Sequence, residues 1–139
     1  MLRALLLCLT VALPAAAQPA VTVEDLAEIR GVINRQIEAF RRDDAREAFA
    51  LVSPGVQQTF STPERFLDVV RVSYRAVYRP ATVAFLGLTV MGQDAVQQVQ
   101  IIDRAGSVWL AYYAMQRQRD GSWRTNGCHL VQPAKTIPT

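Results

Sequence analysis

The chain has one histidine, His129, and it directly follows Cys128, one of two cysteines in the sequence. A thiol beside an imidazole is the combination that cysteine nucleophiles use in catalysis. However, both residues lie in residues 122–131, "SWRTNGCHLV", which have the composition of a strand. Adjacent residues of a strand point to opposite faces of a sheet. The sequence therefore predicts that Cys128 and His129 do not form a catalytic pair.

Each of the two residues also has an interpretation of its own. Cys128 is flanked by apolar strand positions, so we expect a buried, unpaired thiol of low reactivity. His129 is expected at the surface or in a dimer interface. The alternative is an inward His129 that acts as a general base.

Other signals for chemistry are weak. No cluster of cysteine and histidine occurs, so we predict no metal site, and no glycine-rich loop for a phosphate is present, so we predict no cofactor. Arg71, Arg75 and Arg79 are spaced by four residues and form a basic stripe. The stripe is interpreted as a solvated helix face that Glu64 and Asp68 partly balance, with an anion site as the alternative.

Residues 1–17 have the features of a secretory signal peptide. Arg3 precedes an apolar run at residues 5–13, and the alanines at 15–17 fit a cleavage site before Gln18. Cleavage would remove Cys8 and leave a single domain at 18–132 with a loose tail at 133–139. We therefore expect a periplasmic or secreted protein that is not held at a membrane.

The arginines of the predicted mature chain are scattered among acidic residues, and its only lysine is Lys135. A nucleic-acid surface instead concentrates basic residues on one face. The sequence therefore predicts no nucleic-acid partner.

Helical spacing dominates residues 22–79. Three helices are predicted, and each begins at a side chain that can cap the first turn: Thr22, Asp44 and Thr62. Ser53-Pro54-Gly55 is expected to end the second helix, and Arg79-Pro80 the third.

Residues 81–131 change to the composition of strands. Four segments rich in β-branched and aromatic residues, at 81–90, 94–103, 107–118 and 122–131, are separated by short turns that contain glycine. Short turns join antiparallel neighbours. We therefore predict an α+β domain with three N-terminal helices packed on one face of a curved four-stranded antiparallel sheet.

The turn at residues 104–106 sets the register of the second and third strands. A three-residue loop places Val99 opposite Ala111 and Ile101 opposite Trp109. In this register the residues expected under the helices are Trp109, Ala111, Tyr113 and Met115.

The last hairpin has two possible registers. A two-residue turn pairs Tyr113 with Cys128, whereas a three-residue turn pairs Met115 with Thr125. Both pairings can occur in one hairpin if the strand has a bulge at Gly127, because a bulge adds one unpaired residue.

Three segments resemble an uncharacterised bacterial family, domain of unknown function 4864: "IEAFRRDDAREAFALVSP", "TPERFLDVVRVSYRAVYRP" and "AYYAMQRQRDGSWRTNGCHL". More distantly, "AFRRDDAREAF" and "DGSW" are similar to the nuclear transport factor 2-like superfamily. The resemblance implies a cone-shaped α+β fold with a cavity between the helices and a bent sheet.

That superfamily includes ketosteroid isomerases, scytalone dehydratases and proteins that only bind or assemble, so the resemblance does not fix a function. Its enzymes place Asp, His or Tyr inside the cone. The inward positions expected here carry no carboxylate, and they are Tyr74, Tyr78, Trp109, Tyr113 and Cys128.

We therefore predict a non-catalytic binding or accessory module whose aromatic-lined cavity takes a small apolar or aromatic ligand. One alternative is a small lyase or isomerase of the ketosteroid isomerase type. The other is a purely structural domain that dimerises.

The outer face of the sheet is also apolar. The residues expected there are Leu110, Tyr112, Ala114, His129 and Val131. Contiguous apolar surface of this kind often marks an interaction surface. We therefore expect a homodimer that is joined through the outer face of the sheet, as in relatives of the cone fold.

Overall fold

The computed structural model describes residues 11–12 and 20–133, and its folded part is an α+β domain. The helices are α1 (Val23–Arg41), α2 (Ala45–Ala50), α3 (Pro54–Phe60), α4 (Pro63–Ser73) and α5 (Arg75–Tyr78). The strands are β1 (Pro80–Met91), β2 (Asp94–Asp103), β3 (Val108–Arg117) and β4 (Trp123–Val131). The predicted fold class is confirmed. Most of the predicted signal peptide and most of the tail lie outside the described residues.

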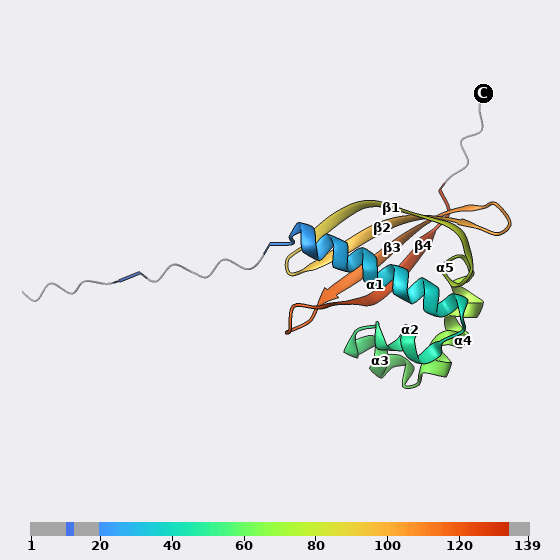
Figure 1. Cartoon of the computed structure of the whole chain (residues 1–139), viewed down its shortest axis with the longest axis horizontal. Helices are drawn as coiled ribbons and strands as arrows, with labels where there is room; N and C mark the ends of the chain where they lie inside the picture. The colour runs from blue at the N-terminus through green and yellow to red at the C-terminus, as the bar shows by residue number, and fades with distance from the viewer. Residues whose placement is uncertain (1–10, 13–19, 134–139) are drawn as a thin grey trace, which may run out of the picture.

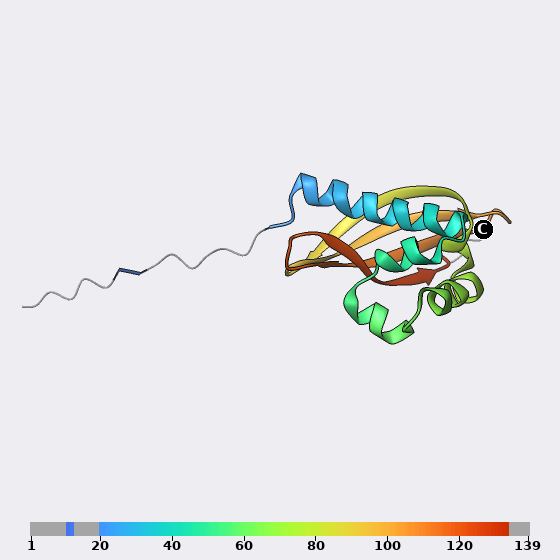
Figure 2. The same cartoon turned by 60° about the horizontal axis from the view of Figure 1, so that its bottom comes forward.

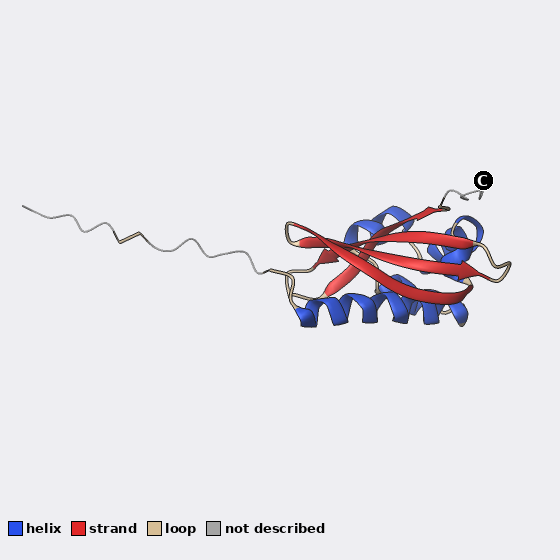
Figure 3. Cartoon of the chain, turned by 90° about the horizontal axis from the view of Figure 1, so that it is seen from above, coloured by secondary structure: helices blue, strands red, loops and turns tan. Residues whose placement is uncertain are grey.

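The strands form one antiparallel sheet in the order β1-β2-β3-β4, and it is strongly twisted (Figure 3). The long helix α1 runs along the sheet, and the shorter helices gather near its C-terminal end (Figures 1 and 2). Within the described part of the chain, no helix combines the length and apolar character needed to cross a membrane.

Three helix starts were predicted correctly. Thr22 and Asp25 form a reciprocal capping box at α1, and Asp44 accepts a hydrogen bond from the backbone N–H of Glu47 at α2. Thr62 caps α4, which has proline at its first position. Side chains within a few residues of each start are sufficient for this capping.

The predicted number of helices was wrong, because Ser53-Pro54 begins a helix. Ser53 Oγ accepts the backbone N–H of Val56 at 3.3 Å, and Pro54 occupies the first turn of α3. A serine followed by proline is a start signal as well as a stop signal. In addition, the predicted third helix is interrupted at Tyr74, whose backbone angles are φ −128° and ψ 46°, so α4 and α5 are separate.

The predicted register of β2 and β3 is confirmed. Val99 lies opposite Ala111, and Ile101 lies opposite Trp109. In the last hairpin Met115 pairs with Thr125 and Tyr113 pairs with Cys128, with a register shift between Ala114 and Met115. The bulge at Gly127, whose φ is +144°, therefore accommodates both pairings.

The connection between α2 and α3 adds a short segment beside β4. The backbone N–H of Ser53 donates to the carbonyl of Thr125 at 2.8 Å, and that of Thr125 donates to the carbonyl of Leu51 at 2.9 Å. Val52 forms a parallel bridge with Thr125. These bonds hold α3 against the strand that carries the bulge.

Candidate ligand cavity

A cavity of about 110 Å³ lies between the helices and the inner face of β3 and β4. Most of its wall is apolar, and it includes five aromatic side chains. The lining residues are Gln36, Phe40, Val52, Val56, Phe60, Phe66, Val69, Val70, Tyr74, Val77, Tyr113, Thr125, Gly127 and Cys128.

Each wall comes from a different element. Phe40 projects from α1 and lies 6.0 Å from the ring of Phe66 on α4, centroid to centroid. Phe60 on α3 meets Phe66 edge to face at 5.4 Å. Such tilted and edge-on pairs are favourable contacts between aromatic rings. The helices that close the end of the sheet thus meet through an aromatic cluster beside the cavity.

The polar groups of the wall are mostly occupied. Gln36 is buried, and its Nε2 donates to the carbonyl of Ala48 and to Thr125 Oγ1, both at 3.1 Å. Thr125 Oγ1 in turn donates to the carbonyl of Leu51 at 3.3 Å. These bonds join α1, the α2–α3 connection and β4.

Tyr113 is the exception. The residue is only 2 % exposed, and its hydroxyl has no hydrogen-bond partner among the described residues. Burial raises the pKa of this hydroxyl well above its usual value, and repulsion from the Cys128 thiolate that forms at high pH raises it further. The phenol is therefore neutral at physiological pH. A buried hydroxyl without a partner costs about 1–3 kcal/mol, so it needs an explanation.

Cys128 lies opposite Tyr113 on the neighbouring strand and lines the same cavity. The thiol forms no disulfide, and burial raises its pKa to about 12. A thiol, and not a thiolate, therefore lines the cavity at physiological pH.

The structure places three of the predicted ligand-binding residues at the cavity: Tyr74, Tyr113 and Cys128. Tyr78 and Trp109 are elsewhere. The hydroxyl of Tyr78 donates to Asp43, and Trp109 Nε1 donates to Asp103 Oδ2 at 3.0 Å. Each of the two side chains donates a hydrogen bond to a carboxylate outside the cavity. The sequence pattern indicated neither of these two carboxylates as a partner.

His129 is exposed and lies opposite Tyr112, whereas Cys128 lies opposite Tyr113. The two side chains are therefore on opposite faces of the sheet, as the alternation along the strand predicts. The alternative in which His129 serves as a base inside the cavity does not fit this position.

The sequence patterns did not indicate four of the cavity residues: Gln36, Phe60, Phe66 and Thr125. Gln36 could have been noticed, because it lies three residues after Ile33 and four before Phe40, on the apolar face of α1. A polar side chain on such a face requires a buried partner. The two phenylalanines look like ordinary core residues, and only the meeting of α3 and α4 distinguishes them.

The chemistry available in the cavity is limited. Its lining includes no carboxylate and no imidazole, the usual groups that take a proton from carbon. No group of three or more potential metal ligands occurs in residues 11–12 and 20–133. The wall can surround an apolar molecule and form a hydrogen bond with a polar atom that this molecule carries.

Comparisons with known proteins give one match. A family model described as a domain of unknown function, DUF4864, matches residues 22–137. No curated protein and no solved structure matches the chain.

Proposed function

We propose that this chain, which belongs to the DUF4864 family, is a binding module that takes a small, neutral, mostly apolar molecule into its cavity. The observation that carries the proposal is the buried hydroxyl of Tyr113, a residue that lines the apolar cavity. This hydroxyl has no hydrogen-bond partner among the described residues. A ligand with one polar atom supplies the missing partner.

The size of the cavity supports a ligand of about one aromatic ring. An apolar cavity of about 150 Å³ in another protein binds benzene. The cavity here is about 110 Å³. A single ring or a short aliphatic chain fits this volume.

The charge state of the wall supports a neutral ligand. Tyr113 and Cys128 both have raised pKa values, so neither is charged at physiological pH. An ionised ligand would be buried without an opposite charge, which is costly. Hydrogen bonding is available from the Tyr113 hydroxyl, which has no hydrogen-bond partner among the described residues.

The experiment uses phenol and toluene, which differ by one hydroxyl, with calorimetry or NMR titration as the readout. We expect phenol to bind with a Kd on the order of 0.1–1 mM, as its few atoms permit. Tyr113→Phe should weaken phenol binding about tenfold, because one buried hydrogen bond is lost. Toluene should bind equally to both proteins.

Tyr112→Phe is the matched control. Tyr112 is the neighbouring tyrosine of β3, but it lies on the outer face opposite His129. We expect this variant to bind both probes like the wild type. The proposal is wrong if neither phenol nor toluene binds saturably. It is also wrong if Tyr113→Phe weakens the binding of phenol and of toluene equally.

A further inference from the structure

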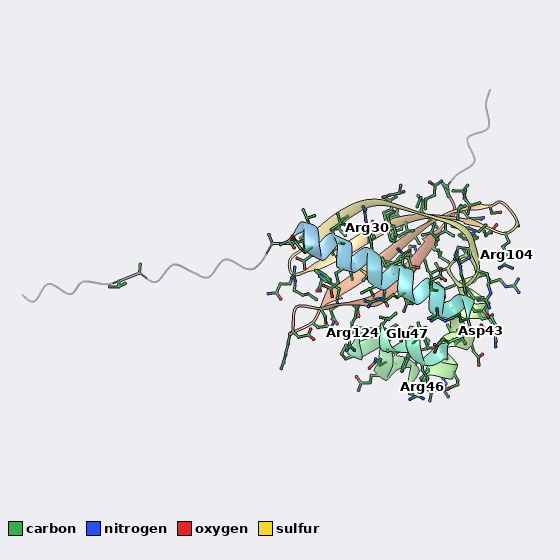
Figure 4. The ribbon with its side chains drawn as sticks, viewed as in Figure 1. Arg30, Asp43, Arg46, Glu47, Arg104 and Arg124 are labelled. Atoms are coloured by element: carbon green, nitrogen blue, oxygen red, sulfur yellow. The ribbon has the colours of Figure 1, made fainter. Side chains whose placement is uncertain are left out.

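A second hollow lies outside the cavity, between α4, α5 and the turn after β2. Its lining residues are Arg71, Arg75, Tyr78, Arg79, Asp103, Arg104 and Ala105. Tyr74 interrupts the predicted helix, but the three arginines of the basic stripe still line the same hollow. Arg104 lines it too, from a turn that is distant in sequence. Figure 4 shows Arg104 at the same end of the molecule as Asp43. Four guanidinium groups and one carboxylate thus line the hollow, and Asp68 and Asp43 pair with two of the four guanidinium groups.

The one carboxylate that lines the hollow is already used inside the protein. Asp103 Oδ1 accepts the backbone N–H groups of Ala105 and Ser107 at 3.0 and 2.9 Å. Asp103 Oδ2 accepts Trp109 Nε1, and this bond is the main reason that the pKa of Asp103 is lowered. Asp103 forms no ion pair with an arginine within the described residues, so it stabilises its own turn.

Arg79 is held in place beside the hollow. Its guanidinium lies over the ring of Tyr78, with 3.9 Å between the central carbon and the ring centroid. One terminal nitrogen donates to the carbonyls of Phe40 and Tyr78, and the other pairs with Asp43 at 3.2 Å. Nε is left without an acceptor among the described residues. Arg79 is therefore oriented before any ligand arrives.

Arg75 and Arg104 are both exposed, and neither forms an ion pair or a side-chain hydrogen bond within the described part of the chain. Each guanidinium has five N–H donors in a planar fork that suits an oxyanion. Arg71 pairs only with Asp68, and both side chains of that pair are more than half exposed. No ion pair within the described residues balances the charges of Arg75 and Arg104, so an anion between them is favourable.

We propose that this hollow binds a phosphate group, with Arg75 and Arg104 as the main donors and Arg79 as a fixed contact. The site is separate from the cavity and does not depend on the proposed cavity ligand. The phosphate can come from a free anion or from a lipid headgroup, because both present the same oxygens.

The first test titrates the protein with inorganic phosphate at pH 7.5 and a constant ionic strength of about 0.1 M, at which charges more than about 10 Å apart are screened. Backbone amides are followed by NMR. We expect saturable shifts in α5 and the turn at residues 104–106. The double variant Arg75→Gln/Arg104→Gln should bind at least about tenfold more weakly, because charge-assisted hydrogen bonds are lost.

The matched control is Arg46→Gln/Arg124→Gln, which removes the same charge. Arg46 lies on α2 and Arg124 on β4, both apart from Arg104 in Figure 4. We expect this control to change affinity less than about twofold, since distant surface charges are screened. Chemical shifts that do not saturate with phosphate would show that the proposed site is wrong. An equal loss of phosphate affinity in the two double variants would show the same.

A second arm identifies the source of the phosphate. Vesicles of phosphatidylglycerol are compared with vesicles of phosphatidylcholine by flotation. Capture by phosphatidylglycerol that is lost in Arg75→Gln/Arg104→Gln supports a lipid headgroup. Phosphate binding without capture by vesicles supports a free anion.

Discussion

At the scale of single residues, the inner face of β4 controls the reactivity of Cys128. The thiol lies beside Tyr113 and among apolar side chains of the cavity wall. Burial disfavours the thiolate and raises the pKa of Cys128 to about 12. Only a thiolate attacks common thiol reagents, so we expect Cys128 to react slowly in the folded protein.

We predict that Cys128 in the native protein reacts with an aromatic disulfide reagent at pH 8 at least about a thousandfold more slowly than in urea. The measurement uses a Cys8→Ser chain, so that Cys128 is the only thiol. Rapid labelling of the folded protein would contradict the prediction. Addition of phenol should slow labelling further if the cavity is occupied.

The raised pKa of Cys128 also affects stability at high pH. In the folded state Cys128 stays protonated up to about pH 12, whereas in the unfolded chain it loses its proton near pH 9. This contribution to stability is complete below about pH 9, and it is lost as the pH rises through the folded pKa.

At the scale of elements, Asp25 connects the start of α1 to two strands. Its carboxylate accepts the backbone N–H of Thr22, pairs with Arg117 on β3 at 3.2 Å and accepts Trp123 Nε1 on β4 at 3.0 Å. The side chains of Asp25 and Arg117 are only 13 % and 12 % exposed. The hydrogen bond from Thr22, followed by that from Trp123, lowers the pKa of Asp25 to about 2.

We predict that Asp25→Asn lowers the free energy of unfolding at pH 7 by about 1–2 kcal/mol, a value reduced for partial solvent screening. The folded pKa is below the unfolded value of 3.8, so this stabilisation is present above about pH 4 and is lost as the pH falls through 2. In urea unfolding, the difference between wild type and variant should therefore shrink between pH 5 and pH 2.

Asp68→Asn is the control for this measurement. Asp68 pairs with Arg71 on the exposed side of α4. We expect a loss of less than about 0.5 kcal/mol, because exposed ion pairs contribute little. An equal loss in the two variants would contradict the role of Asp25 as a connection between elements.

At the scale of the whole molecule, the outer face of the sheet is the candidate interface. Leu110 and Tyr112 are half-buried on this face, and Val131 opposite Leu110 is 37 % exposed. Apolar residues that adjoin one another across strands are costly to leave in water. We propose that two copies meet through this face about a two-fold axis.

We predict that the wild type sediments as a dimer at micromolar concentration, and that Leu110→Glu/Tyr112→Glu gives a folded monomer. The control is Val72→Glu, which also adds charge at an exposed apolar residue but lies on α4. It should leave the dimer intact. A wild-type mass equal to one chain would rule out this interface.

Export of the whole chain stays a prediction, because residues 1–10 and 13–17 fall outside the described part of the chain. The mass of the chain recovered after export tests it. A product that begins at Gln18 is expected.

The sequence by itself determined the features that depend on near neighbours. Thr22, Asp44 and Thr62 cap helices through bonds to residues three positions away, and each was predicted. The register of β2 and β3 followed from turn length and alternation along the strands. For β3 and β4 the sequence left two registers open and indicated Gly127 as the position of a bulge that allows both, as the structure shows. The separation of Cys128 from His129 also followed from the alternation along the strand.

Only the tertiary structure decided which residues line the cavity and which surround the hollow. Tyr78 and Trp109 share the aromatic character of Tyr74 and Tyr113, but their partners Asp43 and Asp103 hold them at the end of the molecule. The unpartnered hydroxyl of Tyr113 and the convergence of Arg104 on the stripe depend equally on residues distant in the chain. Such contacts are set by how the helices pack on a twisted sheet, and local sequence patterns do not specify that packing.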